Sequence, residues 1–218
     1  MFKKALFVFT LAASAAVSVS AQAQPASDYK KTEFYVGYSN GQVDTGVDSG
    51  NSAVDFFRDR ENFNGFEGSG VYNFTRYLGV KGDFSATYNS QRFSGDIGGA
   101  TASVRSKNAL YNYLGGIQVK DNAKEGVFKP FGHVLIGVAN ARSKFTDYTC
   151  TPTTGTCPTV VVPNSTFSET GFAAALGGGV DFRLNDKVQI RAIQVDYNPV
   201  RSSGSTQNNI RLGAGIVF

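Results

Sequence analysis

Apolar and polar residues alternate along most of this chain with a period of two, in runs of about ten residues. Between Leu78 and Tyr88 every second residue is apolar or small, whereas Lys81 and Asp83 fall in the opposite phase. A period of two predicts β-strands whose two faces meet different environments. Because no segment keeps helical spacing over three turns, the pattern predicts an all-β fold.

Eight such runs are separated by polar, glycine-rich gaps. They cover residues 32–40, 62–73, 78–88, 102–120, 127–142, 169–184, 187–197 and 208–218. The gaps after the first, third, fifth and seventh runs are the longer ones. Short turns at one end and long loops at the other are typical of an outer-membrane barrel. We therefore predict an eight-stranded antiparallel up-and-down transmembrane β-barrel forming one domain.

The N-terminal segment has a different character. Lys3 and Lys4 precede an apolar run that ends near Val19, and small residues follow up to Ala23. This layout predicts a secretory signal peptide over residues 1–23, with cleavage after Ala23 or alternatively Ala21. A transmembrane helix is the other interpretation, but the run is short and no charged stop follows it. The barrel domain would then be residues 24–218.

Charge and hydropathy narrow the class of protein. Without the two leader lysines, 19 of the 21 basic residues remain against 17 acidic ones. The net positive charge is small and the charged residues are evenly spread along the sequence, so we expect no nucleic-acid partner. No other stretch approaches the roughly 18 apolar residues that a membrane helix needs. A soluble barrel and a membrane barrel both remain open at this point.

The polar face of the runs favours the membrane barrel. A soluble lipocalin-like barrel hides its apolar face, whereas a membrane barrel turns it toward lipid and ends it with aromatic girdles. Tyr and Phe lie near the ends of the apolar faces, and the opposite faces carry charges of both signs among small residues. Buried charges must be paired. We expect an interior network of Glu67, Lys81, Asp83, Asp181, Arg183 and Arg211.

The seventh run does not keep one phase. Arg191 falls in phase with Ile193, whereas Asp196 falls in phase with Ile190. One of the two charges would face lipid unless a β-bulge shifts the alternation. The sequence leaves the direction of Arg191 and Asp196 open.

The two cysteines, Cys150 and Cys157, lie in one polar stretch with Pro and Gly between them. In an exported protein this spacing predicts a local disulfide. A metal pair is the alternative, but the segment offers no His, Asp or Glu cluster to complete four ligands. We expect neither a metal nor a cofactor.

His133 is the only histidine, so any Ser–His chemistry depends on it. In the outer-membrane deacylases of lipid A, a Ser follows the His by two residues on the same face. Leu135 holds that position here. We therefore expect His133 to be an interior or structural residue and the protein to be no enzyme.

Four segments together resemble the OmpA-like eight-stranded outer-membrane β-barrel family. They are GFEGSGVYNFTRYLGVKGDFS (65–85), KPFGHVLIGVA (129–139), FAAALGGGVDFRLNDKVQIRAIQVDY (172–197) and the final GIVF. The resemblance covers nearly the whole mature chain and implies the bacterial outer membrane as its location. It also implies that the barrel-assembly machinery reads a C-terminal signal, here Leu212, Ala214, Ile216 and Phe218. Some members carry a peptidoglycan-binding domain after the barrel, and we do not expect that function in this protein.

The resulting expectation is an integral outer-membrane protein with a structural role in the envelope. We expect outer-membrane lipid as its surroundings, a monomer, a narrow or closed porin-like lumen for small solutes, and surface loops that offer sites to an unknown extracellular ligand. A lipid-modifying barrel enzyme is one alternative. A soluble lipocalin-like ligand-binding barrel is the other.

Overall fold

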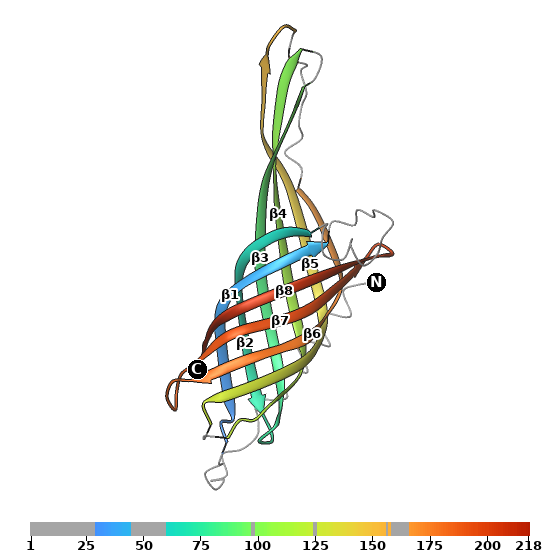
Figure 1. Ribbon diagram of the computed structural model, residues 1–218. Helices are drawn as coiled ribbons and strands as arrows, with labels where there is room; N and C mark the ends of the chain where they lie inside the picture. The colour runs from blue at the N-terminus through green and yellow to red at the C-terminus, as the bar shows by residue number, and fades with distance from the viewer. Residues whose placement is uncertain (1–28, 45–59, 97–98, 124–125, 156, 158–165) are drawn as a thin grey trace, which may run out of the picture.

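A computed structural model describes residues 29–44, 60–96, 99–123, 126–155, 157 and 166–218. The predicted signal peptide lies outside the described residues. Eight antiparallel strands close into a barrel in chain order (Figure 1). They are β1 (Thr32–Asp44), β2 (Arg60–Asn73), β3 (Leu78–Asp96), β4 (Ala100–Lys120), β5 (Phe128–Pro152), β6 (Thr166–Arg183), β7 (Gln189–Ser202) and β8 (Ser205–Val217). Among the described residues no helix is long and apolar enough to cross a membrane.

The barrel closes where the first and last strands meet. β1 pairs with β8 from Tyr35 opposite Val217 to Gln42 opposite Ile210. Beyond that ladder, the backbone N–H of Phe34 donates to Phe218 O at 3.0 Å, and the N–H of Phe218 donates to Phe34 O at 2.8 Å. Closure leaves no unpaired strand edge inside a bilayer, where a free backbone group would be costly. The predicted up-and-down barrel is confirmed.

The outer surface of the barrel is apolar. Exposed aliphatic side chains form its middle, and exposed aromatic side chains lie toward both ends; among the latter are Phe34, Tyr72, Phe128, Phe182 and Phe218 at the short-turn end and Tyr38, Tyr88, Tyr113, Phe172 and Tyr197 toward the long-loop end. An apolar band between aromatic girdles is the surface of a transmembrane barrel. The soluble lipocalin-like alternative is therefore wrong, because such a barrel would place these side chains inside.

The interior has two parts with different chemistry. The half nearer the long loops is filled by an apolar cluster: Phe63, Leu110, Leu114, Leu135, Ala139, Ala173, Ala175 and Val200, with Val43 against it. The half nearer the short turns is filled by buried polar and charged side chains. The sequence analysis expected paired charges among small residues on the inner face and did not identify a separate apolar half. Large side chains fill it because an eight-stranded barrel encloses no more space than side chains occupy.

Three strands continue beyond the barrel wall at the long-loop end (Figure 1). β3 pairs with β4 as far as Asp96 opposite Thr101, and β4 pairs with β5 as far as Ala100 opposite Pro152. β2 pairs with β3 only between Gly79 and Tyr88, so β2 does not follow β3 into the projecting part. We call the projecting part, residues 89–96, 100–108 and 143–152, the extension. The predicted runs ended at Tyr88 and Arg142 because the extension is polar on one face and mixed on the other.

The gap after the seventh run is also shorter than predicted. β7 and β8 remain paired up to Ser202 opposite Ser205, so only Ser203 and Gly204 form the turn. Both have positive φ, 47° and 84°. Positive φ at both central residues matches the twist of a two-residue hairpin turn. The long-loop end is therefore built partly from strands, not from open loops.

Strand β7 contains the irregularity that its sequence pattern required. Arg191 lies opposite Gly215 and Gln194 opposite Gly213, so two residues of β7, Ala192 and Ile193, face a single residue of β8. The register with β6 shifts at the same place. This β-bulge changes the phase of the alternation, and both Arg191 and Asp196 are buried in the interior as a result.

Candidate functional site

The centre of the interior is organised around Arg211 of β8. Its guanidinium donates to Asp83 Oδ1 at 2.7 Å and to Asp196 Oδ2 at 2.7 and 3.0 Å. Glu67 Oε2 lies 3.7 Å from Arg211 Nε. Lys81 Nζ lies 3.3 Å from Asp83 Oδ2. All these side chains are buried, and the short contacts offset the cost of removing the charges from water.

A second group of charges lies closer to the short turns. Lys120 Nζ donates to Glu33 Oε2 at 2.5 Å, to Asp181 Oδ2 at 2.7 Å and to Gln189 Oε1 at 3.0 Å. Arg191 donates to both oxygens of Asp181, at 2.8 and 3.1 Å. Two N–H groups on two carboxylate oxygens give the bidentate geometry for which a guanidinium is suited.

The Arg191 guanidinium also lies between two aromatic rings. Its central carbon is 4.3 Å from the centre of the Tyr35 ring and 4.0 Å from that of Phe131. A cation this close to an aromatic face is attracted by the ring quadrupole. The rings also occupy the space around the guanidinium, so Arg191 and its neighbours fill the cross-section at this level.

Gln194 joins the two groups of charges. Its Oε1 accepts a hydrogen bond from Arg191, and its amide nitrogen donates to Glu67 and Asp196, all at 2.8 Å. We call the whole set the interior network: Glu33, Glu67, Lys81, Asp83, Lys120, Asp181, Arg191, Gln194, Asp196 and Arg211. Five carboxylates and four cations are thus linked in one chain of contacts.

Five of the six residues that the sequence pointed to lie in this network: Glu67, Lys81, Asp83, Asp181 and Arg211. Arg183 does not. It lies at the short-turn end, is partly exposed, and its guanidinium is 3.6 Å from Asp186 three residues later. Position explains the difference, because Arg183 is the last residue of β6 and its side chain reaches the mouth of the barrel.

The sequence prediction missed Glu33 and Lys120, which carry the contacts nearest the short turns. Each lies within two residues of a strand end, where a charge is ordinarily read as part of a turn. The alternation of the two strands could have identified them. Phe34 and Val119 lie on the outward, apolar face, so the adjacent residues Glu33 and Lys120 belong to the inward face.

His133 lies on β5, and its ring points into the barrel beside the interior network. Its Nε2 is 2.8 Å from Asp196 Oδ1, and its Nδ1 is 3.4 Å from Lys81 Nζ. The side chain is fully enclosed. The contacts found for its ring nitrogens are to charged groups and not to a hydroxyl, which agrees with an interior position.

A cavity of about 690 Å³ opens above the apolar cluster at the long-loop end. Phe63, Leu110 and Phe167 line it together with Asp44 and Glu169. Its floor is the apolar cluster, beneath which lies the interior network. The described part of the barrel is therefore filled at two successive levels.

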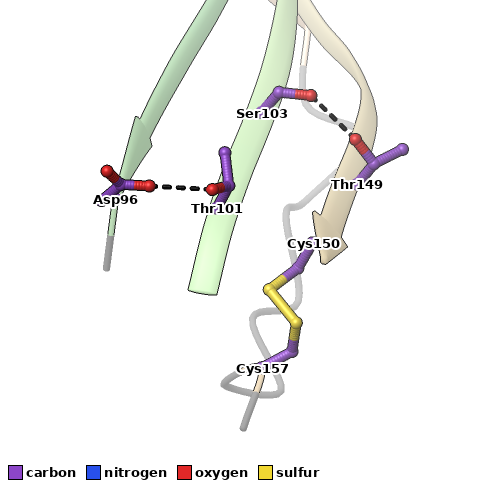
Figure 2. Close-up of a disulfide and its surroundings, with 6 residues drawn as sticks. All are labelled: Asp96, Thr101, Ser103, Thr149, Cys150 and Cys157. Carbon is purple, nitrogen blue, oxygen red and sulfur yellow. Dashed lines mark hydrogen bonds between the residues drawn. A yellow bond between two sulfur atoms is a disulfide. The ribbon is translucent and has the colours of Figure 1, made fainter. Parts of the chain in front are cut away.

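The cysteines lie at the far end of the extension. Cys150 and Cys157 form a disulfide, with their Cα atoms 5.9 Å apart (Figure 2). The backbone N–H groups of Thr153, Thr154 and Gly155 all donate to Gly99 O, which joins this loop to the turn between β3 and β4. Within the described residues, no group of three His, Cys, Asp or Glu side chains has the arrangement of a metal site.

The turns at the opposite end carry their own ion pair. Arg76 donates to Asp121 through Nε at 2.8 Å and through a terminal nitrogen at 2.9 Å. These bonds, with the N–H of Ala123, lower the pKa of Asp121 to about 2. The pair joins the β2–β3 turn to the residues that follow β4.

Comparisons with known proteins agree with this architecture. The fold is similar to that of Ail, the attachment invasion locus protein of Yersinia pestis, in a complex with the heparin analogue sucrose octasulfate. The identity is 18%, the TM-score is 0.51, and the match covers 86% of this chain and 98% of that one. Neisserial surface protein A is similar at 11% identity and a TM-score of 0.49, over 88% of this chain and 98% of the other. A search of curated proteins found no match.

The family comparison covers almost the whole chain. The model of the outer membrane protein beta-barrel domain matches residues 9–218. That match agrees with the eight strands, the apolar outer surface and the closed seam. The chain therefore belongs to the outer membrane protein beta-barrel domain family.

Proposed function

We propose that this outer-membrane barrel is a non-catalytic, non-conducting anchor of the cell envelope, which holds the extension and its disulfide tip above the membrane. The interior network carries the proposal. Its side chains are buried and joined across the barrel, and the apolar cluster fills the adjoining half. A path for ions would require many charge-assisted hydrogen bonds to break together.

Planar bilayer recordings test the closed lumen. We expect the folded protein to give no conductance steps above those of the bilayer. The folded state is verified beforehand by its altered gel migration before boiling. Regular steps from a preparation that is fully folded by this criterion would contradict a closed barrel.

The environment of His133 supports the non-catalytic part of the proposal. The ring is enclosed between Lys81 and Asp196 in the interior, whereas a lipid substrate would meet the outer wall. We expect lipid A from cells with the wild-type protein and with His133→Ala to have identical mass spectra. A lipid change that depends on His133 would support the enzyme alternative.

Family orientation places short turns in the periplasm and long loops outside the cell. Applied here, it puts Gly204 and the extension at the cell surface. An epitope inserted after Gly204, an exposed turn residue, should be detected by antibody on intact cells. An epitope inserted after Asp186, in the turn between β6 and β7, should be detected only after the outer membrane is opened. The reverse result would contradict the orientation.

A further inference from the structure

Five cations lie close together on the outward side of the protein, four on the extension and Arg142 on the adjoining barrel wall. Cross-strand pairing places Arg92 opposite Arg105, Lys107 opposite Lys144, and Ala109 opposite Arg142. Directly paired residues share a face. This face also contains Tyr88, which lies opposite Ala109 on the outer wall. We call Arg92, Arg105, Lys107, Arg142 and Lys144 the basic face.

The positive charges of the basic face are poorly neutralised within the protein. Lys107 and Lys144 lie directly opposite each other, and among the described residues no carboxylate forms an ion pair with either. Arg105 has an acidic neighbour, Asp147, at 3.5 Å. Like charges directly opposite in a sheet are destabilising. Among the described residues, Asp147 is the one acid in an ion pair with these two successive like-charged pairs, and this excess of positive charge points to an anion from outside the protein.

The position of the basic face identifies where such an anion would come from. Arg142 lies over the ring of Tyr111, 5.6 Å from its centre, and Tyr111 meets Tyr88 edge-on at 6.0 Å. Tyr88 is exposed and Tyr111 is half-buried. Tyrosines on the outer wall mark the boundary between hydrocarbon and headgroups. Lys107 and Lys144 lie two residues beyond Arg142, which is about 7 Å along the strands. The lysines therefore lie at headgroup height.

The surface is hollowed at this place. A groove of about 460 Å³ is lined by Tyr88, Ser90, Lys107, Arg142, Lys144 and Thr166, along with neighbouring residues. It lies where the apolar band meets the extension and adjoins the cavity at the barrel mouth, with which it shares Asn108, Ala109 and Arg142. A ligand here would have its polar group against the cations and its apolar part along the tyrosines.

We propose that the basic face binds phosphate groups on the headgroups of the surrounding outer-leaflet glycolipid. Lipid is the occupant because the groove lies on the outer wall of the barrel and adjoins the apolar band that contacts the membrane. Phosphate suits the site because Lys and Arg attract it at close range, and no carboxylate of the described residues forms an ion pair with either lysine. The assignment to the outer leaflet rests on the orientation proposed above, whereas phosphate binding itself does not.

Lipid binding can be measured on the folded, detergent-solubilised protein by native mass spectrometry. The probes are lipid A with two phosphates and the same lipid with its phosphates removed. We expect the wild-type protein to retain the phosphorylated form preferentially. Lys107→Gln/Lys144→Gln should weaken that binding on the order of tenfold, since each basic residue near an anionic surface contributes measurably. Higher salt should weaken it further.

Lys187→Gln/Arg201→Gln is the matched control. It removes the same charge from exposed positions outside the basic face and should change binding less than about twofold. Both variants must first show the altered migration of a folded barrel. Equal loss in the two variants, or equal retention of the dephosphorylated lipid, would overturn the proposal. Displacement of lipid A by millimolar inorganic phosphate, or selective binding of sucrose octasulfate in place of lipid A, would also overturn it, in favour of a soluble anion. The epitope experiment tests orientation separately.

Discussion

At the scale of single residues, stability depends on charges that cannot reach water. Lys120 is buried and contacts Glu33 and Asp181, and Asp181 is shared with Arg191. Replacing the whole set by apolar residues could be neutral, whereas removing one member leaves others unpaired. The two carboxylates around Lys120 make it the member whose loss should cost most in the part of the network near the short turns.

We predict that Lys120→Met lowers the free energy of unfolding by about 3–5 kcal/mol, because two buried carboxylates lose their shared cation. Urea unfolding of the barrel in lipid vesicles measures this. Lys187→Met, in an exposed turn, is the control and should stay within about 0.5 kcal/mol of wild type. Similar small effects of both substitutions would show that the Lys120 contacts do not stabilise the fold.

Glycine provides the space for the network at Gly177. A Cβ built there would lie 2.2 Å from Asp196 Oδ1 and 2.2 Å from the backbone oxygen of Val195. At Gly82, on the outer wall, no atom would lie within 4 Å of a Cβ. We predict that Gly177→Ala destabilises the barrel by about 1–3 kcal/mol through overpacking. Gly82→Ala should be neutral or slightly stabilising, and equal loss of stability in urea unfolding would rule out the steric explanation.

At the scale of elements, the bulge in β7 decides which side chains enter the barrel. Ala192 is the extra residue relative to both neighbouring strands. Without it, Arg191, Gln194 and Asp196 would alternate regularly with Ile193, Val195 and Tyr197. In the observed strand these three polar side chains also point inward, because the bulge between Arg191 and Gln194 changes the phase of the alternation once.

This leads to a prediction that contrasts two deletions in one strand. Deleting Ala192 should give a barrel that still folds, because the charges remain inward and the register becomes regular. Deleting Val195 should abolish folding or cost more than about 3 kcal/mol, because Asp196 turns toward lipid and leaves Arg211 and His133. Altered gel migration shows whether each deletion variant folds, and urea unfolding measures its stability. Equal tolerance of the two deletions would contradict the role given to the bulge.

Alternation along the sequence was sufficient to predict the strand order, the closed barrel and the inward direction of Glu67, Lys81 and Asp83. These residues lie in mid-strand, where apolar neighbours fix the phase. It was insufficient near strand ends, as for Glu33 and Lys120, since charges there resemble turn residues. The bulge partners and the apolar cluster depend on strands far apart in the sequence, which periodicity within one strand does not report.

At the scale of the whole molecule, closure depends on the seam between β1 and β8, where Phe34 and Phe218 exchange two backbone hydrogen bonds. Both side chains are exposed on the apolar wall. The two residues are thus matched in type and surroundings. They differ in that Phe218, with Leu212, Ala214 and Ile216 on the same face, forms the ending that we propose the barrel-assembly machinery recognises.

We predict that Phe218→Ala strongly reduces insertion of the protein into the outer membrane of cells, whereas Phe34→Ala has little effect. In vesicles without assembly machinery, both variants should fold to the same extent, because each keeps its backbone hydrogen bonds and loses one exposed ring. Membrane fractionation measures insertion in cells, and gel migration measures folding in vesicles. If the variants are equally inserted in cells, Phe218 acts only as part of the strand. If Phe218→Ala alone fails in vesicles as well, its ring is needed for the seam itself and recognition is not required to explain the loss.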